Sequence, residues 1–133
     1  MNVDSGLMWS QLSPVLHSFA TRVMARYPFL YHELGHSANT AFVLRAYVGF
    51  CKAGSGDEVA VVVDAASMEK QVSVTSDLAF DDGKIILAGP STILPLYNSD
   101  DEAETAFAEW LNAFKGFLDA AESKLTGIVP NLS

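Results

Sequence analysis

The hydrophobic residues of the N-terminal region recur at every third or fourth position, as they do in an amphipathic helix. Pro14 is tolerated best in a first helical turn and follows Ser13, a good N-cap, so the helix either starts there or bends there. Pro28 ends it, and a short helix over residues 29–34, capped by Gly35, is predicted next. The periodic apolar positions are Met8, Leu12, Val15, Leu16, Phe19, Val23 and Tyr27.

The middle of the chain changes to strand patterns. Residues 41–51 are rich in aromatic and β-branched side chains, and residues 58–64 form an almost continuous apolar run. Residues 71–78 alternate polar and apolar, as expected for a strand with one solvated face. Residues 81–83 are a hairpin signal that leads into a returning strand over 84–88, and a short irregular edge strand is predicted through Ile93 and Leu94.

The last segment predicts a long helix. Ser99 and Glu102 have the spacing of a capping box, and Gly127 with Pro130 ends the run. We therefore expect one α+β domain over residues 1–133. It has an N-terminal helix with a short second helix, an antiparallel meander of three to four strands, and a C-terminal amphipathic helix packed on one sheet face. The apolar positions of this last helix are Phe107, Trp110, Leu111, Phe114, Phe117, Leu118, Ala121 and Leu125.

Composition narrows the function classes. The 133 residues carry 16 acids and 8 bases, a formal net charge of -8, and the bases are scattered, which argues against a nucleic-acid partner. No apolar run approaches the ~20 residues that span a bilayer, and the N-terminus lacks the pattern of a secretory signal. The single cysteine, Cys51, favours a reducing compartment. We expect a cytoplasmic protein with no membrane partner and no cofactor.

The acidity is uneven along the chain. Residues 1–52 hold two acids and four bases, whereas residues 53–133 hold 14 acids and four bases. Much of this charge falls on the outer side of the last predicted helix, where only Lys115 and Lys124 are basic. The acids there are Asp100, Asp101, Glu102, Glu104, Glu109, Asp119 and Glu122.

One string suggests catalysis. His32-Glu33-Leu34-Gly35-His36 resembles the H-E-x-x-H motif of the zincin metallopeptidases. That resemblance implies His32 and His36 as zinc ligands and Glu33 as the base that deprotonates the metal-bound water. A catalytic zinc also needs a third protein ligand, and the metzincin extension fails because Asn39 and Phe42 stand in its glycine and histidine positions. A surface turn that happens to spell the motif is the alternative.

A protein-binding role is therefore favoured over an enzymatic one. A small acidic domain can associate rapidly with a basic partner, as immunity proteins do when they neutralise a toxin or effector. A chaperone-like escort of a secreted protein is the first alternative, and the metallopeptidase is the second. We predict no catalytic residue and leave the oligomeric state open. The predicted protein-binding residues are Asp81, Asp82, Asp100, Asp101, Glu104 and Glu109.

Overall fold

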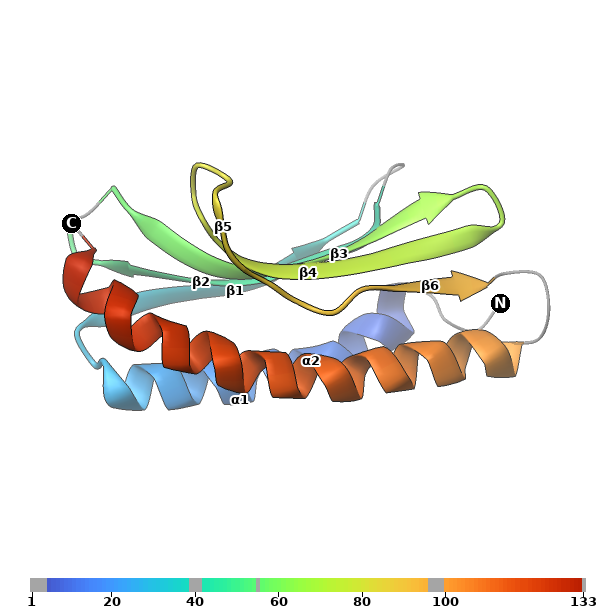
Figure 1. The fold of residues 1–133 in the computed structure, drawn as a ribbon, viewed down its shortest axis with the longest axis horizontal. Coiled ribbons are helices and arrows are strands. Elements are labelled where there is room, and N and C mark those ends of the chain that lie inside the picture. The colour runs from blue at the N-terminus through green and yellow to red at the C-terminus, as the bar shows by residue number, and fades with distance from the viewer. Residues whose placement is uncertain (1–4, 39–41, 55, 96–99, 133) are drawn as a thin grey trace.

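Two helices flank a sheet in the sequence and cover the same face of it in space (Figure 1). The computed structural model describes residues 5–38, 42–54, 56–95 and 100–132. Helix α1 spans Ser5–Arg26 and helix α2 spans Asp100–Ile128, followed by a 3-10 helix, η1, at Val129–Asn131. Within those ranges neither helix combines the length and hydrophobicity needed to cross a bilayer.

The sheet is antiparallel throughout, with the order β1-β2-β3-β4-β5, and β6 pairs with a second stretch of β4. The predicted α+β class and the packing of the last helix on the sheet are confirmed, although the described sheet has more strands than the expected three to four. The strands are β1 (Leu30–Ser37), β2 (Phe42–Lys52), β3 (Glu58–Met68), β4 (Gln71–Phe80), β5 (Ile85–Ala88) and β6 (Thr92–Pro95).

The predicted short helix over residues 29–34 is wrong, because residues 30–34 are the first part of β1. Each residue of β1 pairs with one of β2, and this pairing between neighbouring strands outweighs the local helix signals of Pro28 and Gly35. Helix α1 begins well before Ser13 and continues through Pro14, so Ser13 is not its N-cap. Ser99 of the predicted capping box lies outside the described residues.

The core lies between the helices and one face of the sheet. Alternate residues of β3, such as Val61 and Val63, point toward the helices and are fully buried. The apolar stripe of α1 predicted from the sequence is buried in the same layer, as is that of α2. The helical residues in this core are Met8, Leu12, Leu16, Phe19 and Val23 from α1, and Ala103, Phe107, Trp110, Phe114, Phe117, Leu118, Ala121 and Leu125 from α2.

Two polar contacts fix the segment between β5 and β6 on this core. The indole N–H of Trp110 and the hydroxyl of Ser76 each donate a hydrogen bond of 2.8 Å to the carbonyl oxygen of Pro90. One carbonyl thus satisfies two polar groups that burial would otherwise leave unpaired. The bend after β5 is held against α2 and β4 together.

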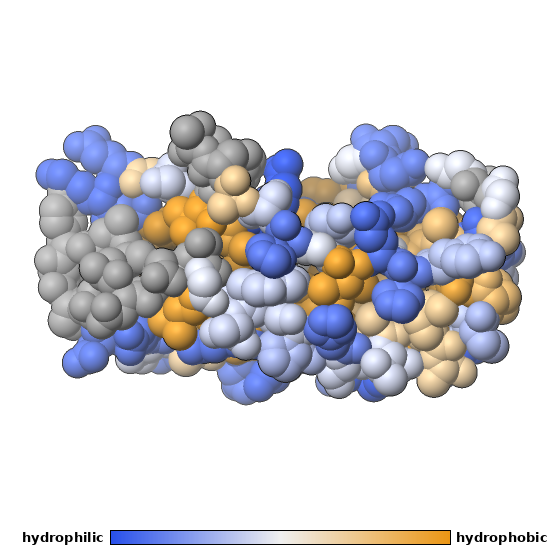
Figure 2. All heavy atoms as spheres, turned by 180° about the vertical axis from the view of Figure 1, so that it is seen from behind, coloured by the Kyte–Doolittle hydropathy of each residue, from blue (hydrophilic) through white to orange (hydrophobic). Residues whose placement is uncertain are grey.

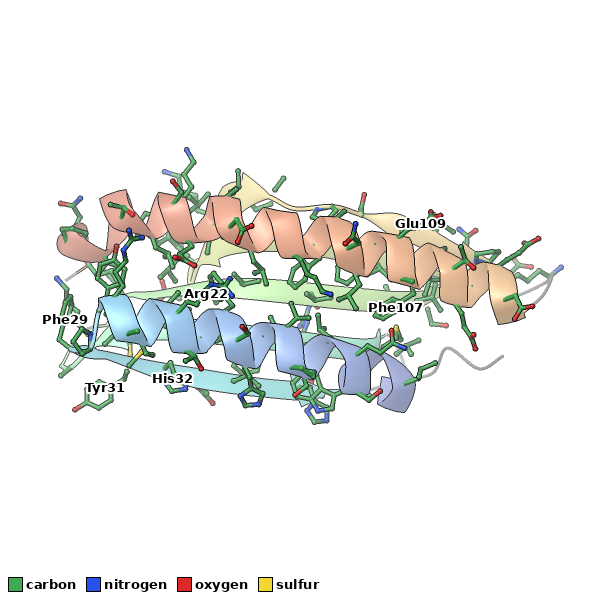
Figure 3. The ribbon with its side chains drawn as sticks, turned by 90° about the horizontal axis from the view of Figure 1, so that it is seen from below. Arg22, Phe29, Tyr31, His32, Phe107 and Glu109 are labelled. Atoms are coloured by element: carbon green, nitrogen blue, oxygen red, sulfur yellow. The ribbon has the colours of Figure 1, made fainter. Side chains whose placement is uncertain are left out.

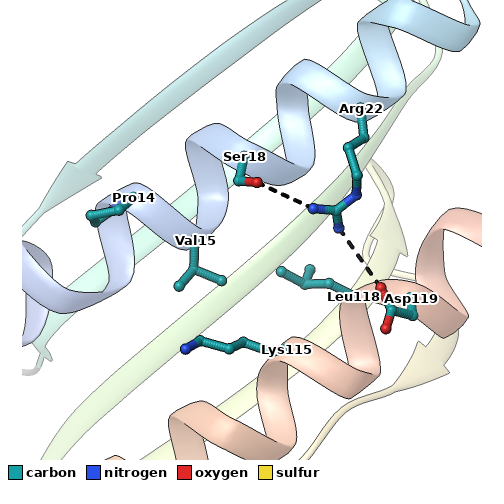
Figure 4. A pocket seen from close by; sticks show the side chains of 7 residues that line it. All are labelled: Pro14, Val15, Ser18, Arg22, Lys115, Leu118 and Asp119. Atoms are coloured by element: carbon teal, nitrogen blue, oxygen red, sulfur yellow. Dashed lines mark hydrogen bonds and ion pairs between the residues drawn. The ribbon is translucent and has the colours of Figure 1, made fainter.

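Arg22 joins the outer surfaces of the two helices (Figure 4). Its Nε donates to Glu122 Oε1 of α2 at 2.9 Å, its Nη1 donates to Ser18 at 3.2 Å, and its Nη2 lies 3.9 Å from Asp119. The hollow between the helices at this point also presents Lys115, which makes no ion pair with the described residues. Arg22 therefore links α1 to α2 through its contacts with Glu122 and Asp119.

The aromatic row of α2 gives a direct test of the core. Phe114 is fully buried, and its ring lies 4.9 Å from that of Trp110. We expect Phe114→Ala to lower the free energy of unfolding by about 4 kcal/mol, because it removes a ring and leaves a cavity. Chemical denaturation measures this loss, with Glu109→Ala on the exposed side of α2 as the control within ~0.5 kcal/mol of wild type. A similar cost for both variants would contradict this core.

Candidate functional site

The face of the sheet opposite the helices carries a groove of about 400 Å³. The sheet ends and the β4–β5 turn rise on this side in Figure 1, and the same side forms the top of the molecule in Figure 2, which shows it from behind. We call this feature the open-face groove. Its lining residues are Arg45, Tyr47, Glu58, Ala60, Val62, Asp64, Asp77, Ala79, Phe80, Asp81, Gly83 and Ile85.

The floor of the open-face groove follows from the two-residue period of the strands. Because every second residue of β3 is buried under the helices, Ala60 and Val62 must face the other way. Their partners across the ladder are Ala79 and Asp77 of β4. These side chains are small or short, so the floor is shallow and the backbone of β3 and β4 lies close to the surface.

Carboxyl groups surround this floor. Glu58 and Asp64 are the first and last groove-lining residues of β3, Asp77 comes from β4, and Asp81 begins the turn after β4. Arg45 is the single base among the lining residues, and its Nε donates to Asp64 Oδ1 at 2.7 Å. Asp64 is therefore neutralised locally, while the other carboxyl groups leave the groove acidic.

Gly35 allows a tyrosine to lie across β1. A Cβ atom at Gly35 would come within 2.9 Å of the Tyr47 hydroxyl oxygen and 3.1 Å of the ring carbon that bears it. Without that Cβ, Tyr47 lies over the strand and its hydroxyl donates to Glu33 Oε1 at 3.0 Å. The glycine predicted as a helix cap instead makes room for a polar contact between β1 and β2.

Gly49 of β2 likewise leaves space for a side chain from the neighbouring strand. A Cβ atom there would come within 2.9 Å of the carboxyl carbon of Glu58. The missing side chain lets the Glu58 carboxyl group lie down on β2, on the side of the sheet where Glu33 and Tyr47 also lie. Three acidic or phenolic groups are thereby gathered at one end of the open-face groove.

This gathering changes their proton affinities. Partial burial raises the pKa of Glu58 above its ordinary value, and the charges of Glu33 and Asp81 raise it further. Partial burial also raises the pKa of Asp77, with a smaller contribution from Asp64. The hydrogen bond to Glu33, followed by burial and the nearby carboxylates, raises the pKa of Tyr47. Full deprotonation of the groove carboxyl groups is therefore unfavourable, and a bound cation would relieve their mutual repulsion.

The structure divides the six acids predicted to bind a partner between two sides of the molecule. Asp81 lines the open-face groove, and Asp82 Oδ1 accepts the backbone N–H of Lys84 at 2.9 Å, a turn-forming bond. Asp101, Glu104 and Glu109 are exposed on α2, beyond the opposite face of the sheet. Asp100 is the first residue of α2, and its side chain lies outside the described part. The binding role of the α2 acids stays a prediction.

Sequence reasoning missed most of the open-face groove, although a signal for part of it was present. Glu58, Ala60, Val62 and Asp64 occupy alternate positions, which places them on one face of any strand they form. The sequence does not show that this face is left uncovered. Nor does it show that Glu33 and Tyr47 join it, because that depends on the pairing of β1 with β2.

The H-E-x-x-H string does not form the site that the zincin resemblance implies. His32 and His36 lie on the helix side of β1, opposite the buried Phe50 and Ala46, whereas Glu33 faces the open side. Residues four apart on a strand are separated by about 13 Å, too far for both to bind one zinc ion. The His36 ring instead stacks on Trp9 with centroids 4.1 Å apart. No group of three or more potential ligands occurs among the described residues.

Comparison with protein-family models, curated proteins and solved structures gave no match. The geometry and the charges of the open-face groove are the observations that bear on function.

The raised carboxyl pKa values predict a pH effect on stability. The folded state holds the Glu58 proton to higher pH than the unfolded state does, so this group stabilises the fold at low pH, and that stabilisation is lost as the pH rises through the folded-state pKa. We expect Glu58→Gln to raise the free energy of unfolding at pH 7, by less than about 0.5 kcal/mol because solvent screens this largely exposed group, and the gain to shrink as the pH falls and the Glu58 carboxyl group takes up its proton in both states. Urea denaturation at several pH values checks this. A gain no larger than that of Glu109→Gln on exposed α2 would contradict the charge crowding.

Proposed function

We propose that the protein is a non-enzymatic binding module that receives a basic segment of a partner protein in the open-face groove. Four carboxyl groups line this groove against one guanidinium, which is already bound to Asp64. Arginine or lysine side chains of a partner would supply the missing positive charge. This charge imbalance on an uncovered sheet face is the observation that carries the proposal.

The shape of the groove supports the same function. Its floor of Ala60, Ala79 and Val62 lets another chain approach the sheet closely, so that long basic side chains can reach the surrounding carboxylates. No histidine, cysteine or serine is among the lining residues, so the groove holds no Ser–His or Cys–His pair. Electrostatic attraction would also speed the encounter with a basic partner.

Inhibition of a basic toxin or effector is the specific form of this function that we favour. A partner whose substrate is an anion needs a basic surface, and an acidic groove that covers this surface would block it. We place this role in the cytoplasm, in keeping with the single free cysteine, Cys51. A secretion-chaperone role is the second candidate, because a shallow open face can also hold an extended, unfolded segment. An inhibitor lowers the activity of a folded partner, whereas an escort keeps its segment unfolded.

A peptide of alternating arginine and valine tests the groove by isothermal titration calorimetry. We expect Glu58→Gln with Asp77→Asn to weaken binding about tenfold, because both carboxyl groups line the groove. The matched variant, Glu104→Gln with Glu109→Gln, removes two exposed carboxyl groups from α2 and should change binding less than about twofold. Equal losses for the two double variants, or affinity unaffected by salt, would contradict the proposal.

A further inference from the structure

One row of the open-face groove crosses the sheet from β2 to β5 and carries apolar or no side chains. Ala60 of β3 pairs with Gly49 of β2 on one side and with Ala79 of β4 on the other, and Ala79 pairs in turn with Ile85 of β5. We call this row of four residues the alanine rung. Ala79 is 8% exposed, yet it does not belong to the core under the helices. Its methyl group therefore lies at the bottom of the groove.

Three carboxyl groups surround the alanine rung. Asp77 and Asp81 are two residues before and after Ala79, so their Cα atoms lie about 7 Å from its Cα atom on either side. The backbone N–H of Asp81 donates to the carbonyl oxygen of Glu58 at 3.0 Å, which extends the ladder one residue beyond β4. The Glu58 carboxyl group itself lies against Gly49, at the β2 end of the rung. None of the three forms an ion pair with the described residues.

The spacing of these carboxyl groups fits a large planar cation better than a metal ion. A divalent metal needs its ligand oxygens within about 2.0–2.6 Å of one point, and no group of three or more potential ligands occurs in the described part of the chain. A guanidinium group instead presents five N–H donors that point outward in one plane. Placed over Ala60 and Ala79, it can donate to carboxyl groups in more than one direction.

We propose that the groove selects an arginine side chain of the partner, whose guanidinium group lies flat on the alanine rung. The proposal rests on the proposed function and specifies the residue of the basic segment that is recognised. Glu58, Asp77 and Asp81 would accept its hydrogen bonds. Ile85, which is 57% exposed and lines the groove, would pack against the methylene groups of the arginine stem.

The apolar floor favours arginine over lysine. An ammonium group is strongly hydrated, and over Ala60 and Ala79 it would lose water without gaining a hydrogen bond from them. A guanidinium group is more weakly hydrated and tolerates an apolar surface against its flat face. Its N–H groups remain directed at the surrounding carboxyl groups. The rung and the carboxyl groups therefore suit the two different surfaces of one arginine.

A second copy of the chain is a poor source of this arginine. The chain has three arginines, and each lies 3.9 Å or less from a carboxylate oxygen of the same chain. Figure 3 shows Arg22 between the two helices, on the side of the sheet away from the groove, and Arg45 belongs to the groove itself. A second copy would also bring a further net charge of -8. Charge complementarity therefore favours an arginine from a different protein.

Two peptides of equal charge test the selection of arginine by the full-length chain. One alternates arginine and valine, and the other has lysine in place of every arginine. We expect the arginine peptide to bind at least about fivefold more tightly in isothermal titration calorimetry. Nuclear Overhauser contacts should join its side chains to the methyl groups of Ala60, Ala79 and Ile85. Equal affinities would overturn the selection of arginine and leave the proposed function standing, whereas no binding of either peptide would contradict both.

A matched pair of isoleucine variants tests the place of the arginine stem. Ile85 of β5 and Ile93 of β6 are 57% and 46% exposed, but Ile93 does not line the groove. Ile85→Ser should weaken the arginine peptide about threefold because the stem loses an apolar contact, whereas Ile93→Ser should leave its affinity unchanged. Equal effects of the two substitutions would overturn the proposed position. A dimer in sedimentation that the peptide dissociates would show that a second copy occupies the groove and would also overturn the proposal.

Discussion

The architecture depends on the burial of two helical stripes against a single face of one sheet. The aromatic row of α2 and the aliphatic row of α1 both need an apolar surface, and the same alternate positions of the central strands provide it. Each large side chain buried in this layer contributes about 2 kcal/mol from removal of apolar surface alone. Arg22 then fixes the helices to each other through Glu122. With both helices on one side, no helix or strand of the described residues covers the other face of the sheet.

The open-face groove is the consequence of that one-sided burial. Every strand residue that turns away from the helices must tolerate water or bind something, and here those positions carry small residues and carboxyl groups. Gly35 and Gly49 let Tyr47 and Glu58 lie flat on neighbouring strands. Partial burial, and after it the nearby charges of Glu33 and Asp81, then raise the pKa of Glu58. Repulsion among these carboxylates destabilises the folded protein, so the binding of a cationic partner would stabilise it.

Most of the fold could be predicted from the sequence, because it rests on local periodicity. The apolar spacing of α2 and the alternation of β4 identify their elements and their buried sides. β1 could not be predicted in this way. Its string from His32 to His36 has no β-branched residue, follows Pro28 and contains Gly35, and these two residues read locally as helix boundaries. Its pairing with β2, the next strand along the chain, makes it a strand.

The candidate site was predictable in part for the same reason. The excess of acids after residue 52 is a property of the sequence, and Glu58, Asp64, Asp77 and Asp81 all belong to that excess. Their convergence is a property of strand register and of the side on which the helices pack. The sequence pointed to acids of α2 instead. The charged face of an amphipathic helix can be recognised from the spacing of its own residues, whereas a groove on a sheet depends on how several strands pair.

The central claim is that the partner binds the sheet face away from the helices, and steric blocking tests it most directly. Ala60 lies on the floor of the open-face groove, and Ala113 is exposed on α2. The affinity of the arginine and valine peptide should fall at least about tenfold in Ala60→Trp, because the indole fills the floor. It should stay within about twofold of wild type in Ala113→Trp. Undiminished binding by a folded Ala60→Trp chain, or a selective loss in Ala113→Trp, would contradict the account.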